Sequence, residues 1–152
     1  MNLATISGPP SSGKTSIILK VIDALKQRNI SVGVVKFDCL YTDDGILYEK
    51  AGVPVKKGLS GSLCPDHFFV SNIEEVVQWG KDKNLDFLIT ESAGLCNRCS
   101  PYIKDIKSVC VIDNLSGINT PKKIGPMLKS ADIVVITKGD IVSQAEREVF
   151  AS

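Results

Sequence analysis

Residues 8–15 have the composition and spacing of a phosphate-binding loop. They read Gly-Pro-Pro-Ser-Ser-Gly-Lys-Thr and match the pattern G-x-x-x-x-G-K-[ST], between a short apolar strand and an amphipathic helix. In such a loop the backbone N–H groups point at phosphate oxygens, and the glycines permit turns that a Cβ would block. Lys14 is expected to reach the β- and γ-phosphates, and the Thr15 hydroxyl to ligate Mg²⁺. The expected nucleotide-binding residues here are Gly8, Pro9, Pro10, Ser11, Ser12, Gly13, Lys14, Thr15 and Ser16.

Two acidic residues stand just past apolar segments that are typical of strands. Asp38 follows residues 31–36, and Glu91 follows residues 86–90. An acid at this position faces the ligand-binding edge of an open parallel sheet. Glu91 is expected to bind Mg²⁺ directly or through water, Asp38 to hold Mg²⁺ or orient the attacking water, and the Gly94 N–H to reach the γ-phosphate. The expected catalytic set for phosphoryl transfer to water is Lys14, Thr15, Asp38 and Glu91, with Thr15, Asp38 and Glu91 as Mg²⁺ ligands.

A third candidate feature is the sequence Thr-Lys-Gly-Asp at residues 137–140, which follows an apolar segment predicted to be a buried strand. The carboxylate of Asp140 can accept two hydrogen bonds from the N1 and N2 donors of guanine. Adenine lacks this donor pair, so an aspartate here selects GTP over ATP. Lys138 is expected to lie along the base plane, and Thr137 to belong to the same nucleotide site.

Cys96 and Cys99 form a Cys-x-x-Cys motif two residues after Gly94. Two thiols at this spacing can hold one metal ion from a single loop. Two chains facing each other would provide four thiolates, which suit Zn²⁺ or an Fe–S cluster and disfavour hard ions. The sequence therefore predicts a metal site close to the γ-phosphate, which two facing chains could complete. Cys110 lies inside an apolar segment and is expected in the core.

Alternation of strands and helices is the pattern that positions these residues. Strands are predicted at 3–7, 31–36, 86–90, 108–112 and 132–137, and helices at 14–28, 46–51, 72–84, 121–129 and 142–150. The helix from 72 is expected to begin with a capping box made by Ser71 and Glu74. Residues 54–70 are loop-rich, and their secondary structure stays unassigned. Because the strands are continuously apolar, they predict a mostly parallel sheet with helices on both faces. The expected fold is α/β, a three-layer P-loop NTPase.

Composition is that of an ordinary globular domain. The chain has 152 residues, 18 Lys+Arg against 17 Asp+Glu, and a formal net charge of +1. This near balance gives no electrostatic drive toward nucleic acid or anionic lipid, and we expect neither as a partner. No apolar run approaches a membrane span and the N-terminus lacks a signal peptide, so a cytoplasmic protein is expected. In that compartment five cysteines indicate metal binding or redox chemistry rather than disulfides.

Taken together, these motifs resemble the nickel-handling GTPases of hydrogenase and urease maturation, which share the broad P-loop class of nitrogenase iron protein. The resemblance covers nearly the whole chain. The matching segments are 8–15 (phosphate loop), 37–44 (first switch), 51–54, 91–94 (second switch) and 119–127 with 131–134 (before the guanine motif). Cys64-Pro65-Asp66-His67 resembles the Cys-Pro-His metal motif of the urease members with Asp66 inserted, and Cys96 and Cys99 stand where the hydrogenase members have one Cys.

This resemblance implies a Mg²⁺-dependent GTPase that acts as a metallocentre-assembly switch. GTP would close a homodimer and bring Cys96 and Cys99, with Cys64 and His67, into one site for Zn²⁺ or Ni²⁺. Hydrolysis to GDP would then release the metal to a client metalloenzyme or to other maturation factors. The family usually continues through another helix and strand, so the expected single domain spans 1–152 with truncation at its C-terminus left open.

Three other functions fit some of the same residues. A nucleotide-gated Fe–S or electron-transfer protein would use the same thiols at a dimer interface. A molybdopterin-guanine-dinucleotide accessory protein is compatible with residues 20–36, although the Cys-x-x-Cys and T-K-x-D motifs disfavour it. A small-molecule kinase would need a substrate lid, which the sequence does not suggest. The identity of the metal and of the client stays open, as does the role of Cys39.

Overall fold

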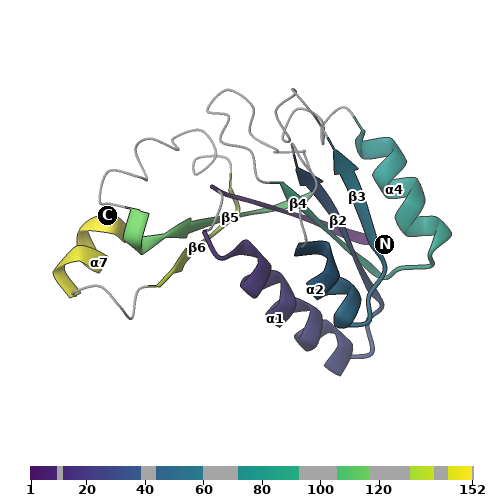
Figure 1. The fold of residues 1–152 in the computed structure, drawn as a ribbon, viewed down its shortest axis with the longest axis horizontal. Helices are drawn as coiled ribbons and strands as arrows, with labels where there is room; N and C mark the ends of the chain where they lie inside the picture. The colour runs from purple at the N-terminus through teal and green to yellow at the C-terminus, as the bar shows by residue number, and fades with distance from the viewer. Residues whose placement is uncertain are drawn as a thin grey trace.

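The computed structural model describes residues 1–9, 12–38, 44–59, 72–92, 106–116, 131–138 and 144–151. The strands are β1 (Asn2–Ser7), β2 (Val32–Asp38), β3 (Val55–Leu59), β4 (Phe87–Ser92), β5 (Lys107–Asp113) and β6 (Ile133–Thr137). The helices are α1 (Lys14–Gln27), α2 (Asp44–Lys50), α4 (Ile73–Asp82) and α7 (Gln144–Ala151), with a 3₁₀ turn η1 (Asn114–Ser116). Strands and helices alternate along the chain from β1 to β4, as expected (Figure 1).

These strands form one sheet in the order β3-β2-β4-β1-β5-β6, and all of its described pairings are parallel. β1 lies between β4 and β5, so the loop that follows β1 opens at the middle of the edge where the strands end. Ile6 of β1 and Lys36 of β2 are both register partners of Glu91 on β4. Because register partners point to the same face of a sheet, these three side chains share one face.

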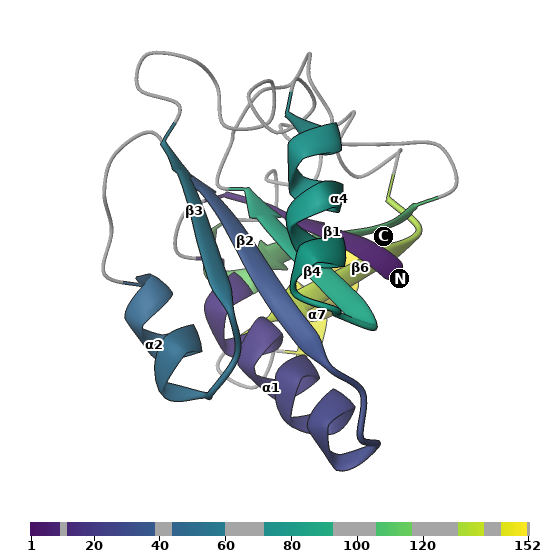
Figure 2. The ribbon, with the colours of Figure 1, turned by 90° about the vertical axis from the view of Figure 1, so that its right-hand side faces the viewer.

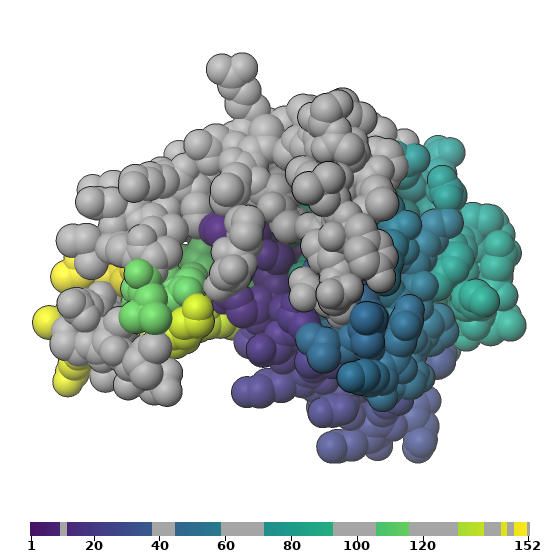
Figure 3. Space-filling model, in the orientation of Figure 1, coloured from purple at the N-terminus to yellow at the C-terminus, as the bar shows by residue number. Residues whose placement is uncertain are grey.

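Helices cover both faces of the sheet. α1 and α2 pack on one face, and α4 packs on the other (Figures 1 and 2). The first core includes Ile18 and Ile22 of α1 and Tyr48 of α2, all fully buried. The space-filling view shows α1 and α2 next to each other on the surface of this face (Figure 3). This three-layer arrangement confirms the α/β fold with a parallel sheet that the sequence predicts.

Three helices end in the same backbone motif, which the sequence marks with Asn or Gly. Asn29, Gly52 and Asn84 have φ of 57°, 77° and 54° after α1, α2 and α4. After α1, the Asn29 N–H donates to the Lys26 carbonyl and the Ile30 N–H to the Leu25 carbonyl. This is a Schellman motif, in which a left-handed residue lets the chain satisfy the last carbonyls of the helix. The predicted helix ends at Asn29 and Gly52 are confirmed.

The structure extends or corrects several local expectations. Residues 55–59, in the segment without an assignment, form strand β3, because an edge strand needs only one partner and tolerates Lys56 and Lys57. β6 is not a buried strand, since Ile133 and Val134 are 53% and 42% exposed. Helix α4 has its N-cap at Asn72, one residue after the predicted Ser71, and the Asn72 side chain makes no capping hydrogen bond. Ser71 itself lies outside the described residues. The predicted helix at 121–129 lies outside the described residues.

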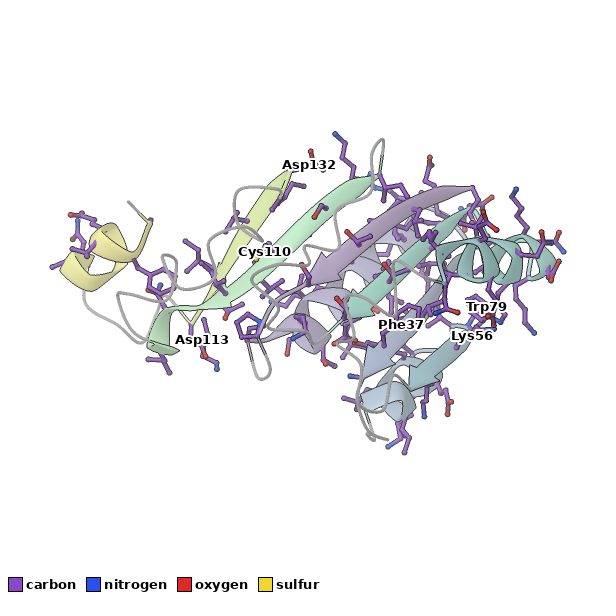
Figure 4. All side chains as sticks on the ribbon, turned by 90° about the horizontal axis from the view of Figure 1, so that it is seen from above. Phe37, Lys56, Trp79, Cys110, Asp113 and Asp132 are labelled. Atoms are coloured by element: carbon purple, nitrogen blue, oxygen red, sulfur yellow. The ribbon has the colours of Figure 1, made fainter. Side chains whose placement is uncertain are left out.

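Phe37 of β2 and Cys110 of β5 lie on the same face of the sheet, because the register relates them through Ser92 and Ser7. In Figure 4, Phe37 lies near Trp79 at the α4 end of the sheet, whereas Cys110 lies on β5. Cys110 is fully buried beside Ile112, with Phe150 of α7 packed against them. The prediction that Cys110 belongs to the core is confirmed.

Candidate nucleotide-binding site

The backbone of the loop after β1 depends on glycine at two positions. A Cβ on Gly8 would lie 2.2 Å from the Val111 carbonyl oxygen of β5, so the loop passes too close to that strand for any side chain. Gly13, the N-cap of α1, has φ of 98° in the left-handed region and lies against the methyl of Thr137. Both glycines that the motif requires are therefore needed for the observed loop path.

Lys14 is the first residue of α1 and is only 5% exposed. Its ammonium donates to the carbonyl oxygens of Gly8 at 3.0 Å and Pro9 at 2.7 Å. The side chain thus curls back over the loop and brings a positive charge to the concave side of its backbone. Thr15 and Ser16 follow in the first turn of α1, next to this charge.

Ser12 provides an unsatisfied donor within the loop. Its side chain is 1% exposed, and its hydroxyl has no hydrogen-bond partner among the residues that the structure describes. Buried hydroxyls almost always have a partner in folded proteins, so an orphaned one suggests a missing ligand. A small anion seated in the loop would supply the acceptor.

The loop is tied to the end of β6 by one side chain. The hydroxyl of Thr137 donates to the Ser12 carbonyl oxygen at 2.6 Å, and the Ile112 carbonyl oxygen is a second acceptor at 3.3 Å. One residue further, Lys138 has φ of 59°, and its ammonium pairs with Asp113 at 2.5 Å. Asp113 ends β5 and also accepts from the Leu115 N–H at 2.7 Å (Figure 4). The first two residues of the predicted guanine motif are thus fixed to the phosphate loop and to β5.

Glu91 lies near the end of β4 and is 2% exposed. One carboxylate oxygen accepts a hydrogen bond from the Tyr48 hydroxyl at 2.6 Å, and the other lies 3.6 Å from the ammonium of Lys36. The sequence motifs do not predict Tyr48 and Lys36 as partners of this acid. Lys36 does carry a signal, because it is a charge that directly follows the apolar residues 32–35.

The structure brings some of the predicted residues together and leaves others undescribed. Gly8, Pro9, Ser12, Gly13, Lys14, Thr15, Ser16, Thr137 and Lys138 lie around one loop, and Glu91 lies on the neighbouring strand β4. Asp38 ends β2 at the same edge of the sheet. Outside the described residues are Pro10, Ser11, Cys39, Cys64, His67, Gly94, Cys96, Cys99 and Asp140. Within the described ranges, no group of three or more His, Cys, Asp or Glu residues is placed to hold a metal ion. Nor does the described part contain a helix with the length and apolarity to cross a membrane.

A parallel sheet with a glycine-rich loop between its central strand and the first helix, a lysine folded over that loop and a buried acid on the next strand defines a P-loop nucleotide-binding domain. Comparison with known families agrees. Residues 2–152 match the family described as CobW/HypB/UreG, nucleotide-binding domain, and the chain belongs to this family. The resemblance inferred from the motifs is confirmed.

Relatives of known sequence extend further than this chain. An uncharacterized protein of Methanocaldococcus jannaschii is 57% identical over 150 residues, which cover 99% of this chain and 64% of the relative. The urease accessory protein UreG of Edwardsiella ictaluri is 34% identical over 154 residues, covering 90% of this chain and 70% of UreG. The chain thus spans about two thirds of the length of these relatives.

Solved structures share the fold. HypB from Helicobacter pylori, solved in complex with nickel, superimposes with a TM-score of 0.74 at 24% identity, covering 99% of this chain and 68% of HypB. The hydrogenase maturation factor HypB from Archaeoglobus fulgidus gives a TM-score of 0.70 at 18% identity, covering 99% of this chain and 75% of that one. At these identities the likeness supports the P-loop fold.

Proposed function

We propose that this domain binds and hydrolyses GTP with Mg²⁺, and that the reaction gates insertion of a metal ion into a client enzyme. The observation that carries the proposal is the hydrogen bond from Thr137 to the Ser12 carbonyl. It joins the strand that leads to Asp140 to the loop that would hold the phosphates. A nucleotide bound to both the phosphate loop and the segment after β6 would therefore contact two parts of the chain that are already hydrogen-bonded to each other.

The loop supplies the phosphate contacts in this proposal. The ammonium of Lys14 exchanges its two loop carbonyls for phosphate oxygens, and the unpartnered Ser12 hydroxyl donates to another. Neither step requires the fold to change, because both groups already lie within the loop. A charge-assisted hydrogen bond to phosphate is stronger than the neutral-acceptor bond that it replaces, so nucleotide binding is favoured.

The donor set fits Mg²⁺, which prefers hard oxygen ligands. Glu91 offers a buried carboxylate that already has a cation, Lys36, beside one of its oxygens. Thr15 would supply a hydroxyl, and Asp38 would hold the ion or orient the attacking water. Bound Mg²⁺ neutralises charge on the β- and γ-phosphates during transfer. The Gly94 N–H is proposed to contact the γ-phosphate and so to report its presence to the segment that follows.

That segment carries Cys96 and Cys99, which we propose as ligands of the transferred metal, together with Cys64 and His67. Zn²⁺ or Ni²⁺ is the proposed cargo, held between two copies of the chain. Support comes from the relatives, which include urease accessory and hydrogenase maturation proteins. These names favour metal insertion over the electron-transfer and molybdopterin alternatives. A client metalloenzyme or another maturation factor is then the proposed partner.

Base selection tests the nucleotide half of the proposal. The wild type should bind GTP much more tightly than ATP. Asp140→Asn should weaken GTP binding on the order of 10²-fold and strengthen the binding of xanthosine triphosphate. The matched control is Asp132→Asn, at the start of β6, where the carboxylate accepts from the Ser108 N–H at 2.8 Å. That control should leave the preference for guanine unchanged. Equal affinity of the wild type for ATP and GTP would contradict the assignment.

Metal titration tests the other half. Zn²⁺ and Ni²⁺ are added to the protein loaded with GDP or with a non-hydrolysable GTP analogue, and the oligomeric state is measured in parallel. The double variant Cys96→Ser/Cys99→Ser should lose tight metal binding and keep GTP binding, whereas Cys110→Ala, a core thiol, should lose neither. Linkage requires metal affinity to differ between the two nucleotide states if nucleotide gates the site. Equal metal affinities in the two nucleotide states would mean that Cys96 and Cys99 form a structural metal site that the nucleotide does not control.

A further inference from the structure

Glu91 is held by two side chains that come from different elements of the fold. Lys36 is its register partner on β2, and Tyr48 reaches it from α2. The three residues are 2%, 5% and 0% exposed for Glu91, Lys36 and Tyr48. They lie on the face of the sheet that α1 covers, at the edge where the phosphate loop opens. We call this set the Glu91 cluster.

Such a buried ion pair is poorly explained by stability alone. Removing two charges from water is costly, and replacing a buried pair by apolar residues is often neutral or stabilising. The positions around Lys36 on β2 show that the strand accepts apolar side chains, because Val34, Val35 and Phe37 are all buried in the core. A lysine among them, paired with an acid at the phosphate edge, indicates a role in the chemistry of that edge.

The two carboxylate oxygens of Glu91 are held differently. Oε2 accepts a short hydrogen bond of 2.6 Å from the Tyr48 hydroxyl, which fixes the orientation of the carboxylate. Oε1 lies 3.6 Å from the ammonium of Lys36, which is beyond the range of a direct N–H···O hydrogen bond. Lys36 thus neutralises the charge on Oε1 without a direct hydrogen bond to it. The lone pairs of this oxygen can accept a further ligand.

We propose that Lys36 is the resident counter-ion of Glu91 until Mg²⁺ binds and then gives up Oε1 to the ion, while Tyr48 keeps Oε2 and holds the carboxylate in place. The inference rests on the proposed function of Glu91 as a Mg²⁺ ligand. Lys36 therefore competes with the metal, and Tyr48 supports it as a positioning residue. The phosphates of the bound nucleotide balance the charge of the released ammonium.

This arrangement predicts opposite effects for the two partners of one carboxylate. Mn²⁺, visible by electron paramagnetic resonance, replaces Mg²⁺ and is titrated into protein saturated with GDP. Lys36→Met removes the competitor and should tighten Mn²⁺ binding on the order of tenfold. Tyr48→Phe removes the anchor and should weaken it by about tenfold or more. Lys56→Met removes a lysine from β3 that pairs with Glu75 at the surface, and should change nothing.

Two further variants separate this inference from the proposed function. Lys36→Gln should tighten Mn²⁺ binding as Lys36→Met does, and it serves as a second neutral variant if the Lys36→Met protein does not fold. Glu91→Gln should weaken Mn²⁺ binding most. If Glu91→Gln does so and both neutral Lys36 variants bind Mn²⁺ as the wild type does or more weakly, the counter-ion role is refuted and the nucleotide site stands. If Glu91→Gln binds Mn²⁺ like the wild type, the proposed Mg²⁺ role of Glu91 is overturned instead.

Discussion

Thr137→Val removes the hydroxyl that ties β6 to the phosphate loop and keeps the methyl that lies against Gly13. One hydroxyl has one proton, and the distances assign it mainly to Ser12 O at 2.6 Å, with Ile112 O at 3.3 Å as a weaker acceptor. The lost bond is worth about 0.5–1.5 kcal/mol, and a carbonyl left unpaired adds to that cost. Because Ser12 is almost fully buried, water cannot readily replace the donor. We expect the free energy of unfolding to fall by about 1–2 kcal/mol.

Nucleotide affinity should report the same loss. If the loop must be ordered to bind phosphates, 1–2 kcal/mol corresponds to roughly 5–30-fold weaker binding. Fluorescence titration with GTP and with inosine triphosphate measures it, and both nucleotides should weaken equally because the hydroxyl supports the loop rather than the base. Thr137→Ser keeps the hydroxyl and should bind close to the wild type. The reasoning is refuted if Thr137→Val binds like the wild type, or if it changes the preference between the two bases.

Three other predictions, made with four substitutions, test separate parts of the structure. Lys14→Met should weaken GTP about 10²-fold or more, because the loop loses its cation, and unchanged GTP turnover would contradict this. Gly8→Ala should destabilise the fold by about 2–4 kcal/mol in urea denaturation, because the Cβ meets the Val111 carbonyl 2.2 Å away; a wild-type midpoint would show that the loop can move aside. The backbone N–H of Ser31, and then its hydroxyl, hold the pKa of Asp86 below its usual value. This stabilisation is complete above about pH 4 and is lost as pH falls through the lower pKa of the folded state. Ser31→Ala keeps the backbone donor, so its acid-denaturation curve should shift from that of the wild type only part of the way toward that of Asp86→Asn. Identical curves for the two variants would refute the role of the backbone donor.

Local rules in the sequence predict most of the fold. Continuous apolar runs predict the parallel strands, and Asn29 and Gly52 predict helix ends because these residue types adopt left-handed backbone at low cost. β3 was missed because Lys56 and Lys57 break the apolar run. Their strand is recognisable only once β2 lies beside it, and an edge strand needs little hydrophobicity. The exposure of β6 likewise depends on its neighbours, which hydropathy does not report.

The residues of the candidate site also fall into those that a local motif predicts and those that only the tertiary fold brings together. The glycines and Lys14 are predictable because the loop motif is contiguous and each residue acts on the backbone near it. The partners of Glu91 are not, because Tyr48 and Lys36 lie 43 and 55 positions away and meet it only through the packing of α2 and the register of β2. The signal in the sequence is a lysine that directly follows the apolar residues 32–35, and the register of β2 with β4 is what brings it to Glu91.

The hydrogen bond between Thr137 and Ser12 also has a consequence for the order of synthesis. These residues lie 125 positions apart, so the loop leaves the ribosome well before the strand that secures it. At about 5–20 residues per second, the delay is roughly 6–25 s. During that time β1 also lacks its neighbours β4 and β5, which are made after it. A nascent chain therefore carries the complete loop sequence without a finished pocket, and competence to retain a nucleotide arrives late in translation.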